Sequence, residues 1–307
     1  MSAQSAIIPQ PTPHGRFLVL NIRELPLELL KKQLQTLETT RERLRGQNPD
    51  AGLVSSVAFG PDLWRRLHDA APAKLKPLQP IEGKFTMPAT GGDLFVHIQS
   101  QRADLCFALA FAFIGPIAGQ VEVMDERTGF KYMDGRDLTG FVDGTENPQT
   151  EYDRIDAALI GEEDDDFSHG SYVFVQRYSH QMDKWQRLKV DAQEHVIGRS
   201  KLESIELDEA EQPENSHVSR TVIEEDGEEL QILRHSMPYG SSGGEVGLFF
   251  LAYTRDPGII DRMLARMFGS SGDGLSDRLL NFVTPLTGAY FFAPAQGLLE
   301  EVIGLED

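Results

Sequence analysis

The sequence predicts an α+β fold in two similar halves, and the order of its predicted elements is the main reason. In the first half, strand-like and helical patterns follow each other as strand, helix, strand, strand, helix, strand. That order is the signature of a ferredoxin-like unit, in which helices cover one face of an antiparallel sheet. The second half broadly repeats the pattern, and 307 residues suffice for one large domain or for two of about 150 residues each.

The strands of the first half are predicted from short apolar runs that are rich in branched and aromatic residues. Its first helix is predicted because leucines recur at three- and four-residue spacing from Leu27 to Leu37, which places them on one helix face. The predicted strands are residues 17–22, 53–59, 94–98 and 121–124, and the predicted helices are residues 26–44 and 103–113.

The second half is predicted to hold strands at residues 171–178, 229–233, 246–253 and 289–293 and a helix at residues 258–268. An acidic passage, residues 143–170, connects the halves and is predicted to lie at the surface. Its successive acidic residues, 162–166, lack the alternating ligands and central glycine of a calcium-binding loop, so we interpret them as a solvated loop.

Charge and apolar patterning exclude several kinds of partner. The net charge of -19 and the lack of a dense basic cluster argue against nucleic acid and against anionic membranes. The best apolar stretch, residues 105–118, is shorter than the roughly 18 residues that span a bilayer and is predicted to be a buried helix. Residues 1–14 do not resemble a signal peptide, and the single Cys106 rules out an internal disulfide, so we expect a cytoplasmic location.

Several common catalytic motifs are absent from the sequence. It has no glycine-rich phosphate loop followed by Lys, no nucleophile elbow, no histidine pair at helical spacing and no cysteine pair for zinc. These absences argue against common hydrolases and nucleotide enzymes. Because there is also no Cys-x-x-Cys-His, any haem would be held without thioether bonds.

The most unusual segment is residues 140–148, Gly-Phe-Val-Asp-Gly-Thr-Glu-Asn-Pro. Its glycines permit tight backbone turns from which Asp143 would project. Asp-Gly is also an ordinary turn signal. Taken alone, the segment therefore leaves a catalytic loop and a structural turn both open.

Extended upstream to residue 137, the segment reads Asp-Leu-Thr-Gly-Phe-Val-Asp-Gly-Thr-Glu-Asn-Pro. This run resembles the hallmark of the dye-decolourising peroxidases, a family of haem peroxidases, and in particular of its bacterial cytoplasmic B-type subgroup. Residues 197–201, 215–218, 232–240 and 287–294 agree with the family in order and spacing. The resemblance covers nearly the whole chain from residue 17 onward.

The resemblance implies an α+β fold of two ferredoxin-like halves in tandem, antiparallel sheets with helices on one face, with haem in the C-terminal half. We expect residues 1–155 to form the N-terminal half that carries the distal aspartate loop, and residues 156–307 to form the haem-binding half. It also implies non-covalent haem b with His217 as the axial iron ligand and with Asp143 and Arg234 on the distal side. Without the resemblance, His217 is one of eight histidines and is not singled out.

Cleavage of hydrogen peroxide at iron needs a base that moves a proton between its two oxygens and a cation that stabilises the departing one. By resemblance Asp143 is the base and Arg234 the cation. The reference pKa of an aspartate is about 3.9, so we expect Asp143, helped by Arg234, to stay ionised at acidic pH, where dye oxidation should be greatest. The family's reaction passes through a ferryl intermediate and oxidises organic reductants, including phenols and bulky dyes.

Two acidic residues are candidates for supporting His217. An axial histidine donates electrons to iron more strongly when its other N–H contacts a carboxylate. We nominate Asp277 for that contact, with Asp273 as the alternative. Arg199 is expected either to bind a haem propionate through its guanidinium or to be an ordinary surface charge.

Three further residues are candidates for the haem surroundings. Ser236 stands two residues after Arg234, where many relatives carry Asn, and supplies a hydroxyl instead of two amide donors. Leu248 and Phe250 alternate along a predicted strand, so they either form an apolar lid over the haem or belong to the ordinary core.

Two other functions stay open from the sequence. One is a haem-handling or iron-releasing protein with incidental peroxidase activity, and the other is an acidic non-catalytic module that binds no haem.

The resemblance also implies a homo-oligomer and raises an encapsulin shell as a partner, although residues 298–307 show no clear targeting tail. The physiological reductant is not identified. Candidate surface aromatics for oxidising bulky dyes are Trp64, Trp185, Tyr132 and Tyr239.

Overall fold

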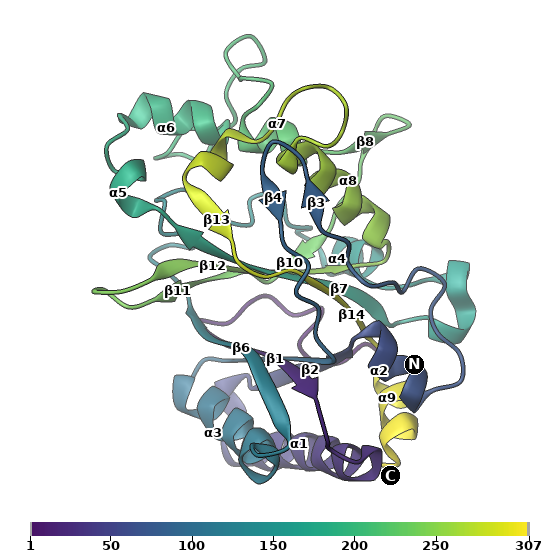
Figure 1. Ribbon diagram of the computed structural model, residues 1–307. Coiled ribbons are helices and arrows are strands. Elements are labelled where there is room, and N and C mark those ends of the chain that lie inside the picture. The colour runs from purple at the N-terminus through teal and green to yellow at the C-terminus, as the bar shows by residue number, and fades with distance from the viewer. Residues whose placement is uncertain (1, 306–307) are drawn as a thin grey trace.

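The first half of the chain forms the predicted ferredoxin-like unit in a computed structural model that describes residues 2–305. The strands lie in the order β6-β1-β5-β2, each antiparallel to its neighbours. Helices α1 and α3 cover one face of this sheet (Figure 1). These elements are β1 (His14–Ile22), α1 (Leu27–Gln47), β2 (Val54–Phe59), β5 (Leu94–Ser100), α3 (Ala103–Ile114) and β6 (Val121–Phe130).

The second half repeats this strand order as β14-β7-β12-β11, again with antiparallel neighbours. Three short helices lie between β7 and β11, and a longer helix follows β12. The elements are β7 (Ser171–His180), α5 (Met182–Trp185), α6 (Val190–Ile197), α7 (His217–Thr221), β11 (Met237–Gly240), β12 (Val246–Thr254), α8 (Pro257–Phe268) and β14 (Ala289–Ala293).

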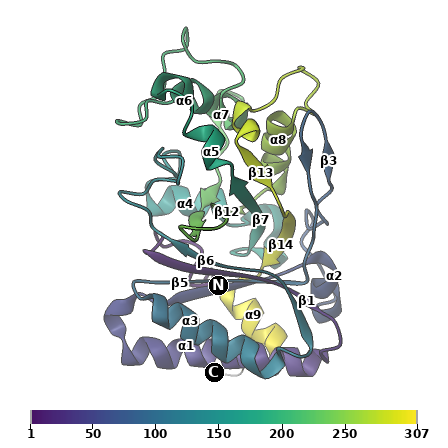
Figure 2. The same ribbon diagram turned by 60° about the vertical axis from the view of Figure 1, so that its left-hand side comes forward.

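The two halves meet face to face and are also joined at their edges. Tyr239 of β11 pairs with Gly129 of β6, and Phe292 of β14 pairs with Phe59 of β2, so eight strands close into a ring. Figure 2 shows the two layers stacked, each with its helices on the outer side. Buried aromatic and aliphatic side chains from both sheets fill the space between them, among them Phe17, Phe95, Phe249 and Phe291.

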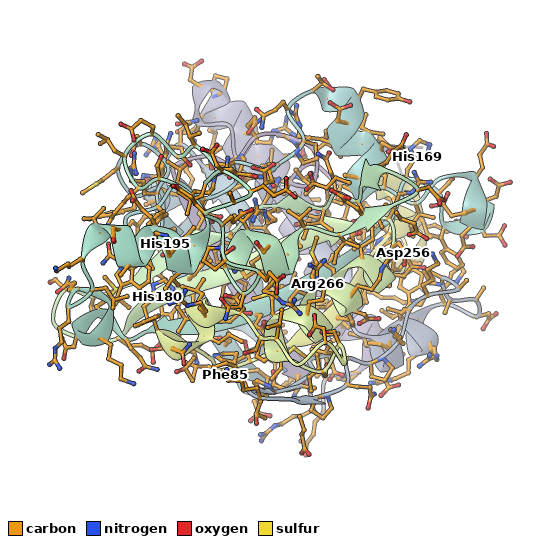
Figure 3. The ribbon with its side chains drawn as sticks, turned by 90° about the horizontal axis from the view of Figure 1, so that it is seen from above. Phe85, His169, His180, His195, Asp256 and Arg266 are labelled. Carbon is orange, nitrogen blue, oxygen red and sulfur yellow. The ribbon has the colours of Figure 1, made fainter. Side chains whose placement is uncertain are left out.

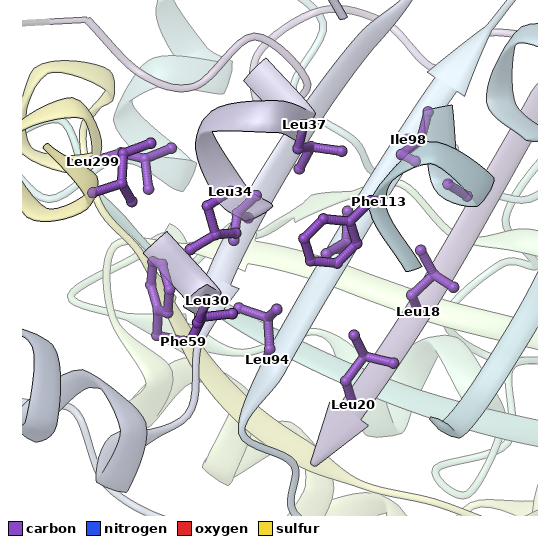
Figure 4. Close-up of a cluster of buried hydrophobic side chains, with 14 of the residues drawn as sticks. Leu18, Leu20, Leu30, Leu34, Leu37, Phe59, Leu94, Ile98, Phe113 and Leu299 are labelled. Atoms are coloured by element: carbon purple, nitrogen blue, oxygen red, sulfur yellow. The ribbon is translucent and has the colours of Figure 1, made fainter. Parts of the chain in front are cut away.

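The core outside the first sheet follows directly from the leucine spacing of α1. Leu30, Leu34 and Leu37 are buried on one face of the helix, where they pack with Phe113 of α3 and Leu18 of β1 in a single apolar cluster (Figure 4). Helix α9 (Gln296–Ile303) adds Leu299 to the same cluster. Burial of these side chains is the main stabilising contribution to this half.

One predicted strand is wrong. Residues 229–233 do not form a single strand, because their two ends pair with different partners. Glu229 belongs to β9 (Glu228–Glu229), which pairs with β8 (Glu224–Glu225), whereas Leu233 belongs to β10 (Leu233–Arg234), which pairs with β12. Residues 230–232 leave the ladder to line a cavity.

The remaining elements are short. The acidic connection between the halves contains α4 (Glu151–Ala158) and the 3₁₀ helix η3 (Glu162–Phe167), and its acidic side chains are mostly exposed. No helix within residues 2–305 is both long and apolar enough to cross a membrane. Residues 306–307 of the segment considered as a targeting tail lie outside the described residues. The other elements are η1 (Pro49–Ala51), α2 (Pro61–Leu67), β3 (Ile81–Glu82), β4 (Thr86–Met87), η2 (Gly115–Ile117), η4 (Arg278–Asn281) and β13 (Val283–Pro285).

Candidate functional site

A large cavity opens on the outer side of the second-half sheet, between β12 and α8. It holds about 1290 Å³ of atom-free space, its open mouth included. Leu248 and Phe250 of β12 and Met263 and Met267 of α8 contribute to a mainly apolar wall. A mainly apolar hollow with a few polar groups is the usual form of a cofactor site.

His217, the first residue of α7, lines this cavity. Its Nδ1 lies 2.6 Å from Oδ2 of Asp277, whose side chain is fully buried. The other oxygen of Asp277 accepts the backbone N–H of Leu279 at 2.8 Å. Both carboxylate oxygens are therefore engaged, the imidazole is held in one orientation, and Nε2 is the ring nitrogen left for a ligand.

Two arginines hold α7 from behind. Arg266 donates to the carbonyl oxygens of Ser219 and Val222 at 2.6 and 2.5 Å, and Figure 3 shows it near the middle of this end of the molecule. The buried Arg220 pairs with Asp273 at 2.7 Å. Asp273, the alternative partner for His217, thus contacts the arginine of α7 instead.

Asp143 lines the cavity from a loop whose backbone requires glycine. Gly140 and Gly144 have φ angles of 91° and 78°, in the left-handed region that side chains disfavour. Arg136 fastens the loop by donating to the carbonyl oxygens of Gly140 at 2.9 Å and Lys201 at 2.5 Å. The turn interpretation and the catalytic interpretation of this segment are therefore compatible.

The pKa of the Asp143 carboxyl is raised above its ordinary value. Burial in the cavity wall raises it most, the charge of Arg234 lowers it, and the Asp137 carboxylate raises it again. Desolvation, which penalises the ionised form, outweighs the arginine. This direction is opposite to the one that the charge of Arg234 alone would give, so the ionised form of Asp143 reaches less far into the acidic range than the sequence suggested.

Arg234 ends β10 and lines the same cavity. The side chain of Asn147 forms two hydrogen bonds with the backbone of Arg234. Nδ2 donates to the Arg234 carbonyl oxygen at 2.8 Å, and Oδ1 accepts from the Arg234 N–H at 3.0 Å. Asn147 therefore ties the loop of Asp143 to the strand of Arg234. Asn147 belongs to the unusual segment, but the sequence does not reveal its role, because the contact joins residues 87 positions apart.

The other predicted site residues divide into two groups. Leu248 and Phe250 lie in the cavity wall, as a lid would require. Ser236 and Arg199, in contrast, are not among the described residues that line the cavity. The hydroxyl of Ser236 accepts the N–H of Leu251 at 3.3 Å, and Arg199 pairs with Glu146 at 2.5 Å, at the cavity's edge.

The cavity has a second polar corner that sequence analysis missed. Asp137 and His180 both line it, with Asp137 Oδ2 at 3.7 Å from Nδ1 of His180. Nδ1 of His180 has no hydrogen-bond partner in the part of the chain that the structure describes. His180, labelled in Figure 3, is the second imidazole of the cavity and so the natural competitor of His217 as a ligand.

The mouth of the cavity is acidic. Glu146 and Glu229 both lie in its lining. The pKa of Glu229 is raised, first by burial and then by the negative charges of Glu146, Glu206 and Glu224. A cation near this mouth would be attracted and an anion repelled.

Three of the four aromatic residues expected at the surface are buried. Trp64, Trp185 and Tyr239 are at most 3% exposed. Trp185 donates its ring N–H to the carbonyl oxygen of Thr139 at 2.8 Å, which is the usual way to bury an indole. Tyr132 is partly exposed and is the one of the four that solvent reaches directly.

The residues present fit a haem group. The apolar wall suits a flat macrocycle, and an imidazole with one nitrogen held by a carboxylate suits an axial ligand of haem iron. Asp143 and Arg234 add a titratable group and a fixed charge to the same cavity. No group of three or more His, Cys, Asp or Glu side chains within residues 2–305 is placed to hold a bare metal ion.

Family models match almost the whole chain. The N-terminal model of the Dyp-type peroxidases matches residues 4–131, and the C-terminal model matches residues 134–297. A dye-decolorizing peroxidase of Rhodococcus erythropolis is 42% identical over 303 residues, which is 96% of this chain and 89% of that protein.

Solved structures agree with these matches. An encapsulated DyP-type peroxidase from Mycobacterium smegmatis superposes with a TM-score of 0.92 at 40% identity, covering 98% of each chain. A DypB variant from Rhodococcus jostii, solved in complex with haem, superposes with a TM-score of 0.91 at 40% identity, covering 97% of this chain and 99% of that one.

Proposed function

The chain belongs to the dye-decolourising peroxidase family, and from that premise we propose which residues carry its haem b peroxidase activity. His217 would hold the haem iron through Nε2, and Asp143 and Arg234 would act on hydrogen peroxide in the same cavity. The observation that supports this most directly is that all three line one apolar cavity, with Nδ1 of His217 already held by Asp277.

When bound in this cavity, haem would supply the redox chemistry by which two oxidising equivalents of hydrogen peroxide reach reductants. Asp143 would take a proton from one oxygen of hydrogen peroxide and return it to the other oxygen, which leaves as water. The carboxylate can do this only while it is ionised, so its raised pKa sets the lower end of the active pH range.

Arg234 supplies the positive charge that the leaving oxygen needs. Its guanidinium also lowers the pKa of Asp143 and so opposes the effect of burial. Asn147 positions the arginine by holding its backbone at both the N–H and the carbonyl. A charge fixed before the reaction stabilises the transition state more than mobile water does.

Asp277 sets the electronic character of His217. Its buried carboxylate accepts a hydrogen bond from the Nδ1–H group of His217, which makes Nε2 a stronger electron donor. That favours peroxide cleavage over reversible ligand binding.

Small reductants are proposed to react at the cavity mouth, where Glu229 favours cationic molecules while Glu146 is paired with Arg199. Phenols would enter the same opening. Bulky dyes would react at the protein surface, for which Tyr132 remains the accessible candidate among the four aromatics considered. Arg199 is proposed to bind a haem propionate only by exchanging its present carboxylate partners.

The chain is further proposed to be cytoplasmic and homo-oligomeric, with an encapsulin shell as a possible partner, since one relative is described as encapsulated. We also keep the division at residues 155 and 156 as a proposal. It falls within α4, so limited proteolysis there tests whether the halves are separable.

The experiment that tests the function is steady-state turnover of a panel of reductants with peroxide, alongside an absorption spectrum and analysis of the porphyrin. Turnover with intact haem supports a peroxidase. Release of iron with little turnover would favour the alternative, a haem-handling protein with incidental peroxidase activity.

A further inference from the structure

A buried polar cluster lies between the two sheets, away from the cavity. It consists of Ser56 on β2, His97 on β5, Tyr253 on β12 and His235, which directly follows β10, and each is at most 2% exposed. We call these four residues the inter-sheet cluster. Phe17 stacks on the ring of His97 at 5.2 Å and seals one side of it.

The hydrogen bonds of the cluster have one arrangement that satisfies both hydroxyl groups. The oxygens of Ser56 and Tyr253 are 2.6 Å apart, and the Tyr253 oxygen is 3.0 Å from Nδ1 of His97. If Ser56 donates to Tyr253, the phenol is free to donate to His97, whose Nδ1 accepts. The phenolic proton is then already directed at a base.

The imidazoles of the cluster are unusually poor in partners. Nε2 of His97 and both ring nitrogens of His235 lack a hydrogen-bond partner among residues 2–305. Buried polar atoms are nearly always paired, because an unpaired one costs about 1–3 kcal/mol. One phenol and two imidazoles therefore stabilise the fold less than apolar side chains would in this space, which is otherwise lined by phenylalanine and aliphatic side chains.

The cluster and the proposed haem cavity lie on opposite faces of the second-half sheet, and β12 contributes side chains to both. Along β12, Phe250 points into the cavity, whereas Tyr253 belongs to the cluster of side chains between the sheets. Side chains alternate in this way along any strand. Arg234 at the end of β10 lines the cavity, whereas the next residue, His235, belongs to the inter-sheet cluster, where its ring contacts the Tyr253 ring edge to face at a centroid distance of 5.4 Å.

We propose that Tyr253 is an internal electron donor to the oxidised haem, used when no external reductant is at hand. One electron leaves the phenol and reduces the haem by one equivalent. The O–H bond of Tyr253 breaks as its proton passes to Nδ1 of His97, which leaves a neutral tyrosyl radical beside an imidazolium. An electron from an external reductant, with return of the proton, restores the phenol.

The resting protonation states suit this step. Burial lowers the pKa of His97 well below its usual value, so the imidazole is neutral at rest and takes no proton from the intact phenol; only oxidation, which makes the phenol far more acidic, drives the proton to it. Burial also raises the pKa of Tyr253, so the phenol keeps its proton until it is oxidised. Proton and electron must therefore leave Tyr253 together.

This inference rests on the proposed peroxidase function, and freeze-quench electron paramagnetic resonance tests both separately. The holoenzyme is mixed with one equivalent of hydrogen peroxide without reductant, and each sample is also read by optical absorption. We expect a tyrosyl signal that narrows when ring-deuterated tyrosine is incorporated. No change in haem absorption would contradict the proposed function, whereas a haem change without a tyrosyl signal would overturn only the role of Tyr253.

Variants locate the radical. Tyr253→Phe should lose the signal, and the control Tyr290→Phe should keep it, since Tyr290 is also buried but donates to the Asp261 carboxylate and lies outside the inter-sheet cluster. His97→Gln, which keeps Tyr253 but removes the base, should lower the radical yield. An unchanged signal in Tyr253→Phe, or an undiminished yield in His97→Gln, would overturn the proposal.

A measurement on the unmodified holoenzyme covers the case in which the variants do not fold. A gadolinium chelate in the solvent should leave the microwave-power saturation of the tyrosyl signal unchanged, because Tyr253 has no exposed surface. Strong relaxation by the chelate would place the radical at the surface and so overturn the proposal.

Discussion

Replacing Arg234 with Leu should slow the first reaction with peroxide at least as much as replacing Asp143 with Ala. Asp143→Ala removes the proton carrier, and general acid/base catalysis typically contributes about 10²–10⁴-fold. Arg234→Leu removes a fixed positive charge, and loss of one such electrostatic donor typically costs about 10²–10³-fold. The arginine variant suffers a second loss, because Arg234 also lowers the pKa of Asp143.

The rate lost through the pKa of Asp143 depends on pH, and the direction of the pKa shift decides at which pH the loss appears. Asp143 is an effective base above its pKa and loses that role as pH falls through it. Since burial already raises this pKa, the acid limb should begin at higher pH than for a free aspartate. Removal of Arg234 should move the acid limb to still higher pH. At any pH below the pKa of Asp143, each unit by which that pKa rises should lower the rate by about a further tenfold. Asp143→Ala should abolish the limb.

Stopped-flow absorption after mixing with hydrogen peroxide measures both rates across the pH range. The control is Arg255→Leu, which removes an arginine paired with Asp156 and Glu163 on the surface and should leave the rate unchanged. All variants should retain haem. A near-wild-type rate in Arg234→Leu, or an acid limb that does not move, would refute the assigned division of work between the two residues.

Three further outcomes are expected. Asp277→Asn should keep haem but raise its reduction potential and slow peroxide cleavage, because Nδ1 of His217 loses a charged partner at 2.6 Å; an unchanged potential would contradict this. Asn147→Ala should slow peroxide cleavage by about tenfold, because it removes about 1–1.5 kcal/mol of hydrogen bonding that positions Arg234. The surface variant Asn281→Ala serves as its control. Turnover of a cationic reductant should fall as ionic strength rises, and it should also fall in Glu229→Gln. Turnover of an anionic reductant should rise in both cases. Equal responses of the two reductants would rule out an effect of the acidic mouth.

The regular elements were predictable because each follows from a local pattern. The helix α1 (Leu27–Gln47) appears where its leucines recur, and β12 and β14 lie within a residue of their predicted ends. The strand predicted at residues 229–233 failed because local composition does not show that Leu230 and Ile232 turn toward a cavity. Pairing with two different partners is a property of the fold, not of the segment.

The site was predictable in part, through a resemblance and not through chemistry visible in the chain. That resemblance pointed to His217, Asp143 and Arg234, which the structure brings to one cavity. The roles of Asn147 and His180 depend on contacts with Arg234 and Asp137, which are distant in the sequence, so no local motif could predict them. The direction of the Asp143 pKa was missed for a physical reason: the sequence shows the arginine but not the burial that outweighs it.

The identity of the iron ligand is the point on which the proposed site depends, and the cavity offers two histidines for it. The most direct measurement is the haem content and Soret spectrum of His217→Ala beside those of His180→Ala, both reconstituted with haem in the same way. We predict that His217→Ala loses or greatly weakens haem binding, while His180→Ala keeps the wild-type spectrum. Full occupancy and an unchanged Soret band in His217→Ala would contradict the assignment, and loss of the band in His180→Ala alone would transfer it to His180.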